Sequence, residues 1–170
     1  LLFDGDLGLA NIDVQLGLMP SYDLGSVIAG HVSLDDAICR FEDSDRGENS
    51  GFDILAGKSG SGSLSTLSKA QLQGLSRGLK SLSPFYDLMV IDLPAGLDNS
   101  VTFLSSQCQS IYVVLTDEPT SLTDAYAYIK VIARSDPQAK FKVIVNMAAR
   151  NADGERIFGS LDQACTNFLN

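Results

Sequence analysis

The chain has 170 residues, 45% apolar and 19% charged, which indicates a globular domain and excludes disordered and fibrous classes. Its net charge of −9, without a cluster of Lys or Arg, argues against a nucleic-acid partner bound through phosphates. Three separated cysteines and one histidine exclude a CxxC metal site and a disulfide framework, and no apolar run approaches the roughly 20 residues that span a bilayer, so we expect a cytoplasmic protein.

Short apolar runs alternate with stretches of helical period along the chain, which is the pattern of βαβ units. Helices are expected over 72–82, after Ser121, where Ser121 and Asp124 resemble a capping box, and over 157–168. We therefore expect an α/β fold, a doubly wound and mostly parallel sheet with helices on both faces. The expected strands are Leu1–Phe3, Phe52–Leu55, Tyr86–Ile91, Ser110–Leu115 and Phe141–Val145.

Two carboxylates, Asp4 and Asp6, directly follow the first expected strand. In open parallel sheets ligands bind outside the carboxyl ends of the strands, so polar residues at these ends are candidates for a site. Carboxylates two residues apart can hold a hydrated Mg²⁺ or orient a water for attack. The alternative is a turn with helix-capping Asp residues.

Asp92 ends the apolar run 88–91, which is the pattern of a Walker B carboxylate that holds a nucleotide's metal through water. Gly96, four residues on, could let the backbone present an N–H to a γ-phosphate. An ordinary strand-to-loop Asp is the alternative. Asn146 ends the last strand and can both donate to and accept from an adenine edge, or simply cap a loop.

The loop Gly57-Lys58-Ser59 does not make a phosphate-binding Walker A motif. Phe52 occupies the position five before Gly57, where that motif requires Gly, and 60–63 (GSGS) separates the loop from any helix. We interpret it as a flexible loop. His31 is expected in a solvated turn, and Cys39 and Cys165 are expected as core thiols on helix faces.

Taken in order, these segments resemble the deviant-Walker-A ATPases of the MinD/ParA class. The stretch 1–18 (LLFDGDLGLANIDVQLGL) is similar to the family's paired-Asp motif, and 92–96 (DLPAG) is similar to its Walker B and switch II. Within the class, 118–126 (EPTSLTDAY) and Asn146-Met147 most resemble the flagellar-number regulators, the FlhG/FleN group. The resemblance covers essentially the whole chain.

This resemblance implies a role for each candidate residue. Asp6 would be the catalytic carboxylate that positions the attacking water, and Asp4 and Asp92 would hold Mg²⁺ through its waters. Gly96 would lie in switch II and Asn146 would contact adenine. The family implies a switch in which two protomers sandwich two ATP molecules until hydrolysis to ADP separates them. Its flagellar members act with a transcriptional activator and a partner GTPase to set flagellar placement and number.

The chain departs from the family pattern at both ends. The family's Walker A motif lies upstream of the paired Asp, and its C-terminal portion carries an amphipathic helix that targets the inner membrane peripherally. We therefore expect 1–170 to be a single incomplete MinD-like ATPase domain, with the first strand and P-loop absent. The full-length protein is expected to be an ATPase, and this segment alone is expected neither to bind ATP tightly nor to hydrolyse it.

The motifs also allow two other functions. A cell-division MinD-type ATPase has nearly the same motifs, and a regulatory binding domain without hydrolysis would work through protein contacts alone. The absence of a Cys pair excludes the iron–sulfur carriers of the class. The acidic charge disfavours its DNA-binding partition ATPases.

Overall fold

The computed structural model describes the chain except for residues 7, 44–46, 48–49, 58–66 and 170. The chain divides into two compact units, Leu1–Pro94 and Ala95–Asn170, and each is taken by itself below. No helix in the described part of the chain is long and apolar enough to cross a membrane.

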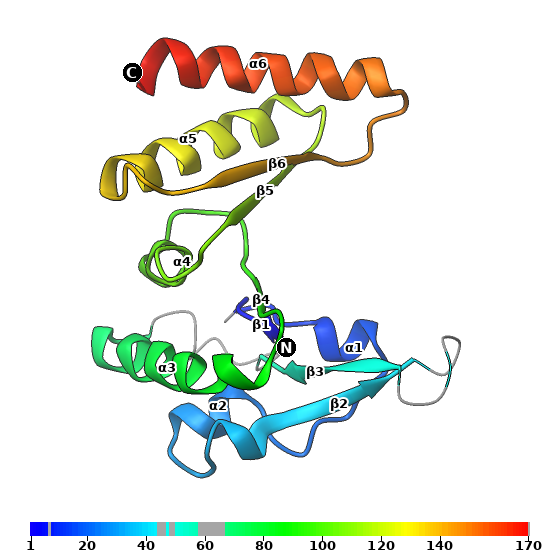
Figure 1. Cartoon of the computed structure of the whole chain (residues 1–170), viewed down its shortest axis with the longest axis vertical. Coiled ribbons are helices and arrows are strands. Elements are labelled where there is room, and N and C mark those ends of the chain that lie inside the picture. The colour runs from blue at the N-terminus through cyan, green and yellow to red at the C-terminus, as the bar shows by residue number, and fades with distance from the viewer. Residues whose placement is uncertain (7, 44–46, 48–49, 58–66, 170) are drawn as a thin grey trace. The chain divides into compact units, whose positions relative to one another are not determined.

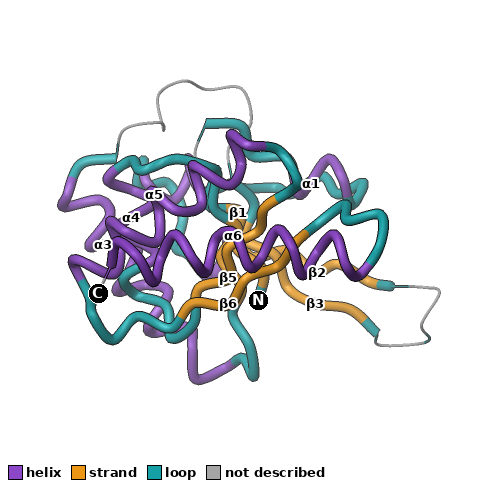
Figure 2. Tube along the Cα trace, turned by 90° about the horizontal axis from the view of Figure 1, so that it is seen from above, coloured by secondary structure: helices purple, strands orange, loops and turns teal. Residues whose placement is uncertain are grey.

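The first unit holds a mixed sheet in the order β2-β3-β1-β4 among its described strands (Figures 1 and 2). The central strand β1 pairs in parallel with β3 and with β4, and β2 is an antiparallel edge strand joined to β3 as a hairpin. The strands are β1 (Leu2–Asp4), β2 (Ile38–Glu42), β3 (Gly51–Leu55) and β4 (Val90–Asp92).

Helix α3 (Lys69–Leu82) forms because its leucines recur every three or four residues and its start is capped. The Ser68 hydroxyl accepts the backbone N–H of Gln71, whose side chain accepts the backbone N–H of Ser68 in return. The predicted helix is confirmed, and its four leucines are buried. The shorter helical segments of this unit are α1 (Ile12–Gln15), α2 (Leu24–Ile28), η1 (Asp35–Ala37) and η3 (Ser83–Phe85).

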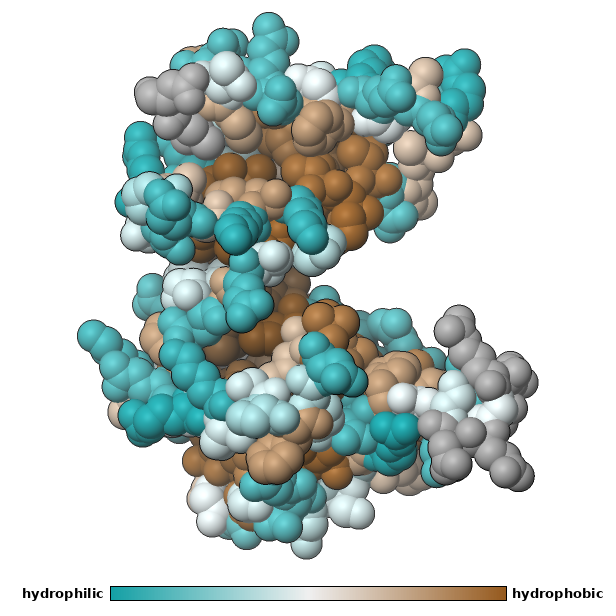
Figure 3. Space-filling model, viewed as in Figure 1, coloured by the Kyte–Doolittle hydropathy of each residue, from teal (hydrophilic) through white to brown (hydrophobic). Residues whose placement is uncertain are grey.

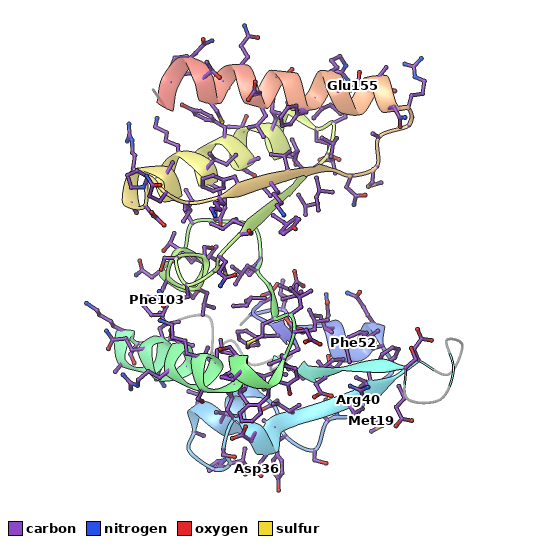
Figure 4. The ribbon with its side chains drawn as sticks, in the orientation of Figure 1. Met19, Asp36, Arg40, Phe52, Phe103 and Glu155 are labelled. Atoms are coloured by element: carbon purple, nitrogen blue, oxygen red, sulfur yellow. The ribbon has the colours of Figure 1, made fainter. Side chains whose placement is uncertain are left out.

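The second unit has two parallel strands whose inward residues, Val113 and Leu115 among them, pack against α5 and α6. These helices lie together beside the sheet in Figure 1, with Glu155 on the exposed side of α6 (Figure 4). Apolar residues of this unit gather beneath the polar outer surface of α6 (Figure 3). The elements are α4 (Asn99–Ser105), β5 (Ile111–Leu115), α5 (Pro119–Ser135), β6 (Phe141–Val145) and α6 (Asn151–Leu169).

The α/β class with mostly parallel strands is confirmed, but the predicted elements need correction. The strand β2 was not predicted, and Cys39 lies on it rather than on a helix. Helix α5 begins at Pro119, a residue that suits the first position of a helix, and the Ser121 hydroxyl inside it accepts the Thr116 N–H instead of capping. The predicted strand Tyr86–Ile91 shortens to β4, because the chain leaves η3 only at Phe85 and bends at Asp87 before the strand begins.

Candidate functional site

Asp4 ends β1 and is the most buried carboxylate of the site, at 1% exposure. Its Oδ2 accepts the backbone N–H groups of Asn11 at 2.9 Å and Ile12 at 3.0 Å. Its Oδ1 accepts the N–H of Asp6 at 3.3 Å. Both oxygens are thus used to fold the loop between β1 and α1 back over the end of the strand. Any contact of Asp4 with a metal would have to share these lone pairs.

Asp6 lies in that loop and is half-buried. Its Oδ1 accepts the N–H groups of Gly8 at 3.1 Å and Leu9 at 2.9 Å, which fixes the direction of the carboxylate. Among the described residues no hydrogen bond to its Oδ2 is present. Asp6 is therefore held in place by one oxygen and can offer the other to a water or a metal-bound water.

Asp92 ends β4 directly beside Asp4, its register partner on β1. The side chain is exposed, yet the pKa of Asp92 is raised, first because the surrounding protein partly desolvates the carboxylate and then because Asp4 and Asp6 add negative charge. No Lys or Arg of the described chain offsets these carboxylates in that shift. Within the described part of the chain, the three acids thus gather negative charge at the carboxyl edge of the sheet.

Two glycines allow the loop and the sheet to approach this closely. Gly5 donates its N–H to the carbonyl of Asp92 at 2.8 Å, and a Cβ on Gly5 would lie 2.7 Å from that carbonyl oxygen. A Cβ on Gly57, just after β3, would collide with the Cβ of Ala10 and lie 3.1 Å from the Asp4 carbonyl oxygen. Sequence reasoning missed both roles, because a close approach leaves no signal beyond the glycine itself. Lys58 and Ser59 of the rejected Walker A pattern lie outside the described residues.

Gly96 and Asn146 belong to the second unit. Gly96 has φ +126°, a conformation that suits glycine, and nothing lies within 4 Å of a Cβ placed there. Asn146 follows β6 and is exposed, with its backbone N–H donated to Leu115 at 2.8 Å and its Oδ1 accepting the Met147 N–H at 2.9 Å. The Oδ1 atom of Asn146 is thus engaged by the backbone of its own loop.

The described residues fit a hydrated magnesium ion better than a directly bound one. No group of three or more His, Cys, Asp or Glu within the described chain is arranged to hold a metal by side chains alone. The negative charge of Asp4 and Asp6 around Asp92 nevertheless favours a cation, and Asp6 and Asp92 can accept hydrogen bonds from its waters. Asp4 would act on such an ion mainly through its negative charge.

Comparison with known proteins gives relatives over almost the whole chain. The antiactivator FleN of Pseudomonas aeruginosa is 37% identical over 169 residues, 99% of this chain and 58% of FleN. The flagellum site-determining protein YlxH of Helicobacter pylori is 26% identical over 98% of this chain and 53% of YlxH. This chain therefore spans about half the length of these two relatives.

Solved structures agree with the sequence relatives. The septum site-determining protein MinD of Pyrococcus horikoshii, solved in complex with Mg-ADP, matches with a TM-score of 0.72 and 26% identity, over 95% of this chain and 64% of that one. No family model matches the chain.

Proposed function

The chain belongs to the MinD/ParA class of ATPases, and on that premise we propose that it is part of a nucleotide switch that binds and hydrolyses ATP to regulate the placement and number of flagella. Because the chain covers only 58% and 53% of its flagellar relatives, the proposal concerns the complete protein that carries these residues.

The observation that carries the proposal is the arrangement of three carboxylates at one sheet edge. Asp4 and Asp92 sit side by side on adjacent strands, and Asp6 follows in a loop whose shape Asp4 fixes. The charge of Asp4 and Asp6 raises the pKa of Asp92 after desolvation, and such mutual repulsion costs free energy unless a cation relieves it. A bound Mg²⁺–nucleotide would supply that cation.

Within this proposal each candidate residue has its own role. Asp6, with Oδ1 tied to the loop, accepts a hydrogen bond from the attacking water through Oδ2 and orients it. Asp92 and the charge of Asp4 hold the waters around Mg²⁺. A bound Mg²⁺ would neutralise the charge that develops on the phosphate oxygens. Gly96 would present a backbone N–H in switch II, and Asn146 would donate through Nδ2 to adenine.

The proposal extends to partners and location. An ATP-bound homodimer is the form expected of a switch of this class, and hydrolysis would return it to monomers. The P. aeruginosa relative is an antiactivator, which supports a transcriptional activator as a partner. By resemblance to the flagellar regulators, we also propose that the protein acts with a partner GTPase. It would lie in the cytoplasm and associate peripherally with the inner membrane.

The experiment is ATP hydrolysis by the complete reading frame that contains residues 1–170. Asp6→Ala should reduce hydrolysis by at least about 100-fold while ATP binding and dimerisation persist, since general-base positioning contributes about 10²–10⁴-fold. Asp87→Ala is the matched control, because Asp87 is exposed and lies ahead of β4 rather than at its end. Undiminished turnover in Asp6→Ala would exclude Asp6 from catalysis. Absence of any turnover in the unmodified protein would favour the regulatory binding domain.

A second experiment separates the flagellar role from a septum-site role. Deleting the gene in its host should change the number or position of flagella if the proposal holds. Division at the wrong site, with flagella unchanged, would instead support a MinD-type function, which the septum-site relatives at 25–28% identity also allow.

A further inference from the structure

A pocket of about 350 Å³ lies in the first unit of the chain. Elements η1, β2, α3 and η3 each contribute to its wall, together with the residue that follows η3. The lining residues are Asp35, Ile38, Leu82, Phe85 and Tyr86. None of them belongs to the candidate functional site, so the pocket has no part in the function proposed above.

The wall of the pocket combines aliphatic surface with two aromatic rings. Ile38 and Leu82 supply the aliphatic surface, and Phe85 contributes a side chain that is 80% exposed. The Tyr86 side chain is fixed, because its hydroxyl donates to Asp53 Oδ2 at 2.9 Å. The pocket therefore offers a ligand mainly carbon surface, part of it from aromatic rings.

Asp35 is the charged group of the pocket, and it is exposed. Within the described part of the chain, no hydrogen bond or ion pair engages the Asp35 carboxylate, whereas its neighbour Asp36 accepts the Ser33 hydroxyl at 2.6 Å. Burial, Asp53 and then the charge of Asp35 raise the pKa of Tyr86, so this carboxylate acts on the pocket wall. The pocket thus carries a negative charge that is available to a ligand.

This combination of groups fits the side chain of an arginine. A guanidinium group stacks on aromatic rings and pairs with a carboxylate, while the aliphatic stem of arginine lies along apolar surface. No Lys or Arg among the described residues lines the pocket, and nearby Arg40 forms an ion pair with Asp53 at 3.1 Å. The net charge of −9 adds a general attraction for a basic partner.

The shape of the pocket favours an anchor from a larger molecule over a free small molecule. Small-molecule sites span about 300–1,000 Å³ and bury most of their ligand, whereas Asp35 and Phe85 stay exposed at this one. We propose that the pocket is a docking site for an arginine side chain presented by a partner protein. The body of such a partner would cover the exposed ring of Phe85. The inference goes beyond the proposed function, since it requires neither a nucleotide nor the three carboxylates.

The test titrates the complete reading frame with the blocked tripeptide acetyl-Gly-Arg-Gly-amide and follows NMR chemical shifts. The matched probe replaces arginine by citrulline, which has nearly the same shape but no charge. The arginine peptide should bind with a dissociation constant on the order of 1 mM and shift the amide resonances of Ile38 and Phe85. The citrulline peptide should bind about fivefold to tenfold more weakly, because it loses both the cation–aromatic contact and the ion pair.

Two variants assign the binding to the pocket. Asp35→Asn removes the charge and Phe85→Ala removes the exposed ring, and each should weaken binding of the arginine peptide by about twofold to fivefold. Both side chains are exposed, so neither substitution should unfold the chain. Asp36→Asn is the matched control, because Asp36 is an adjacent exposed carboxylate that does not line the pocket.

Four outcomes would overturn the inference. Equal binding of the arginine and citrulline peptides would show that the pocket does not recognise charge. An equal loss of affinity in Asp36→Asn and Asp35→Asn would show attraction by the overall negative charge of the chain instead. Shifts centred on Asp6 and Asp92 would place the peptide at the carboxylate site. The absence of any shift at about 10 mM arginine peptide would show that no such anchor binds.

Discussion

The Oδ2 of Asp4 accepts the backbone N–H of Ile12 at 3.0 Å, so a buried carboxylate at the end of β1 anchors the first residue of α1, eight positions along the chain. The same oxygen accepts the N–H of Asn11. The loop that carries Asp6 lies between these anchors, and its geometry therefore depends on a residue that solvent scarcely reaches.

Removing the Asp4 carboxylate should lower the stability of the fold, apart from any effect on ATP hydrolysis. Asp4→Ala leaves the buried N–H of Ile12 and the partly buried N–H of Asn11 without their acceptor, which should reduce the free energy of unfolding by about 2–4 kcal/mol. Urea titration followed by circular dichroism measures the change. The control Asp87→Ala should remain within about 0.5 kcal/mol of the unmodified chain. Equal stability of the two variants would show that the Asp4 hydrogen bonds do not hold the loop.

Asp92→Asn should stabilise the apo chain at neutral pH. Since the pKa of Asp92 is raised in the folded chain, the folded state binds its proton more tightly than the unfolded state does. The ionised carboxylate then destabilises the fold above its ordinary pKa of about 3.9, and this cost disappears as the pH falls below that value. Melting curves of Asp92→Asn and of the unmodified chain should be recorded between pH 3 and pH 7, at intervals of about one pH unit. Near pH 7 the Tm of the variant should exceed that of the unmodified chain by at most a few degrees, and in acid the difference should vanish. A gain that persists in acid would contradict this explanation.

The raised pKa of Tyr86 predicts that the folded chain loses stability at alkaline pH. Partial burial and then its 2.9 Å hydrogen bond to Asp53 raise the pKa of Tyr86 to about 12. The neutral phenol is thus favoured by the fold, so this stabilisation is complete below the ordinary pKa of about 10 and is lost as the pH rises toward 12. Allowing for solvent screening, the loss should be about 1 kcal/mol. Denaturant titrations between these pH values should show it in the unmodified chain and not in Tyr86→Phe.

Two glycines should respond oppositely to the same substitution. Gly5→Ala places a methyl group 2.7 Å from the Asp92 carbonyl oxygen and 2.9 Å from the Leu93 side chain, and should cost about 1–3 kcal/mol. Gly74 lies in the interior of α3, and an added Cβ there would meet nothing within 4 Å outside the helix's own backbone. Gly74→Ala should therefore stabilise the chain by about 0.5–1 kcal/mol through helix propensity. Thermal melts of both variants measure the difference. A neutral Gly5→Ala would mean that the loop can move away from β4.

The sequence predicted the elements that have strong periodicity. The leucines of α3 recur at helical spacing, and β5 and β6 are apolar runs of strand length. The residues that end β1 and β4 could be identified because each directly follows an apolar run. The strand β2 was missed, since it is a short edge strand (ICRFE) with charged residues and pairs with β3 across a long polar connection. Edge strands lack the apolar character of central strands.

The sequence shows which carboxylates end β1 and β4, but not the hydrogen bonds around them. The roles proposed for Asp6 and Asp92 rest on their positions, whereas the three backbone N–H groups that Asp4 accepts have no side-chain signature. The positive φ of Met147, +58°, could not be predicted either, because methionine is not a residue type that favours positive φ. Close approaches and backbone conformation depend on tertiary structure, and a single sequence does not record them.

The dependence of the loop on Asp4 has a consequence for recognising inactive descendants of such proteins. A gene copy that has lost hydrolysis but still needs its fold would retain Asp4, because its carboxylate accepts the N–H groups of Asn11 and Ile12 at the start of α1. It could lose Asp6, whose side-chain hydrogen bonds among the described residues go to its own loop. With the role proposed for Asp6, the second acidic residue of the pair, rather than the first, would be the informative marker when inactive copies are distinguished from working ATPases.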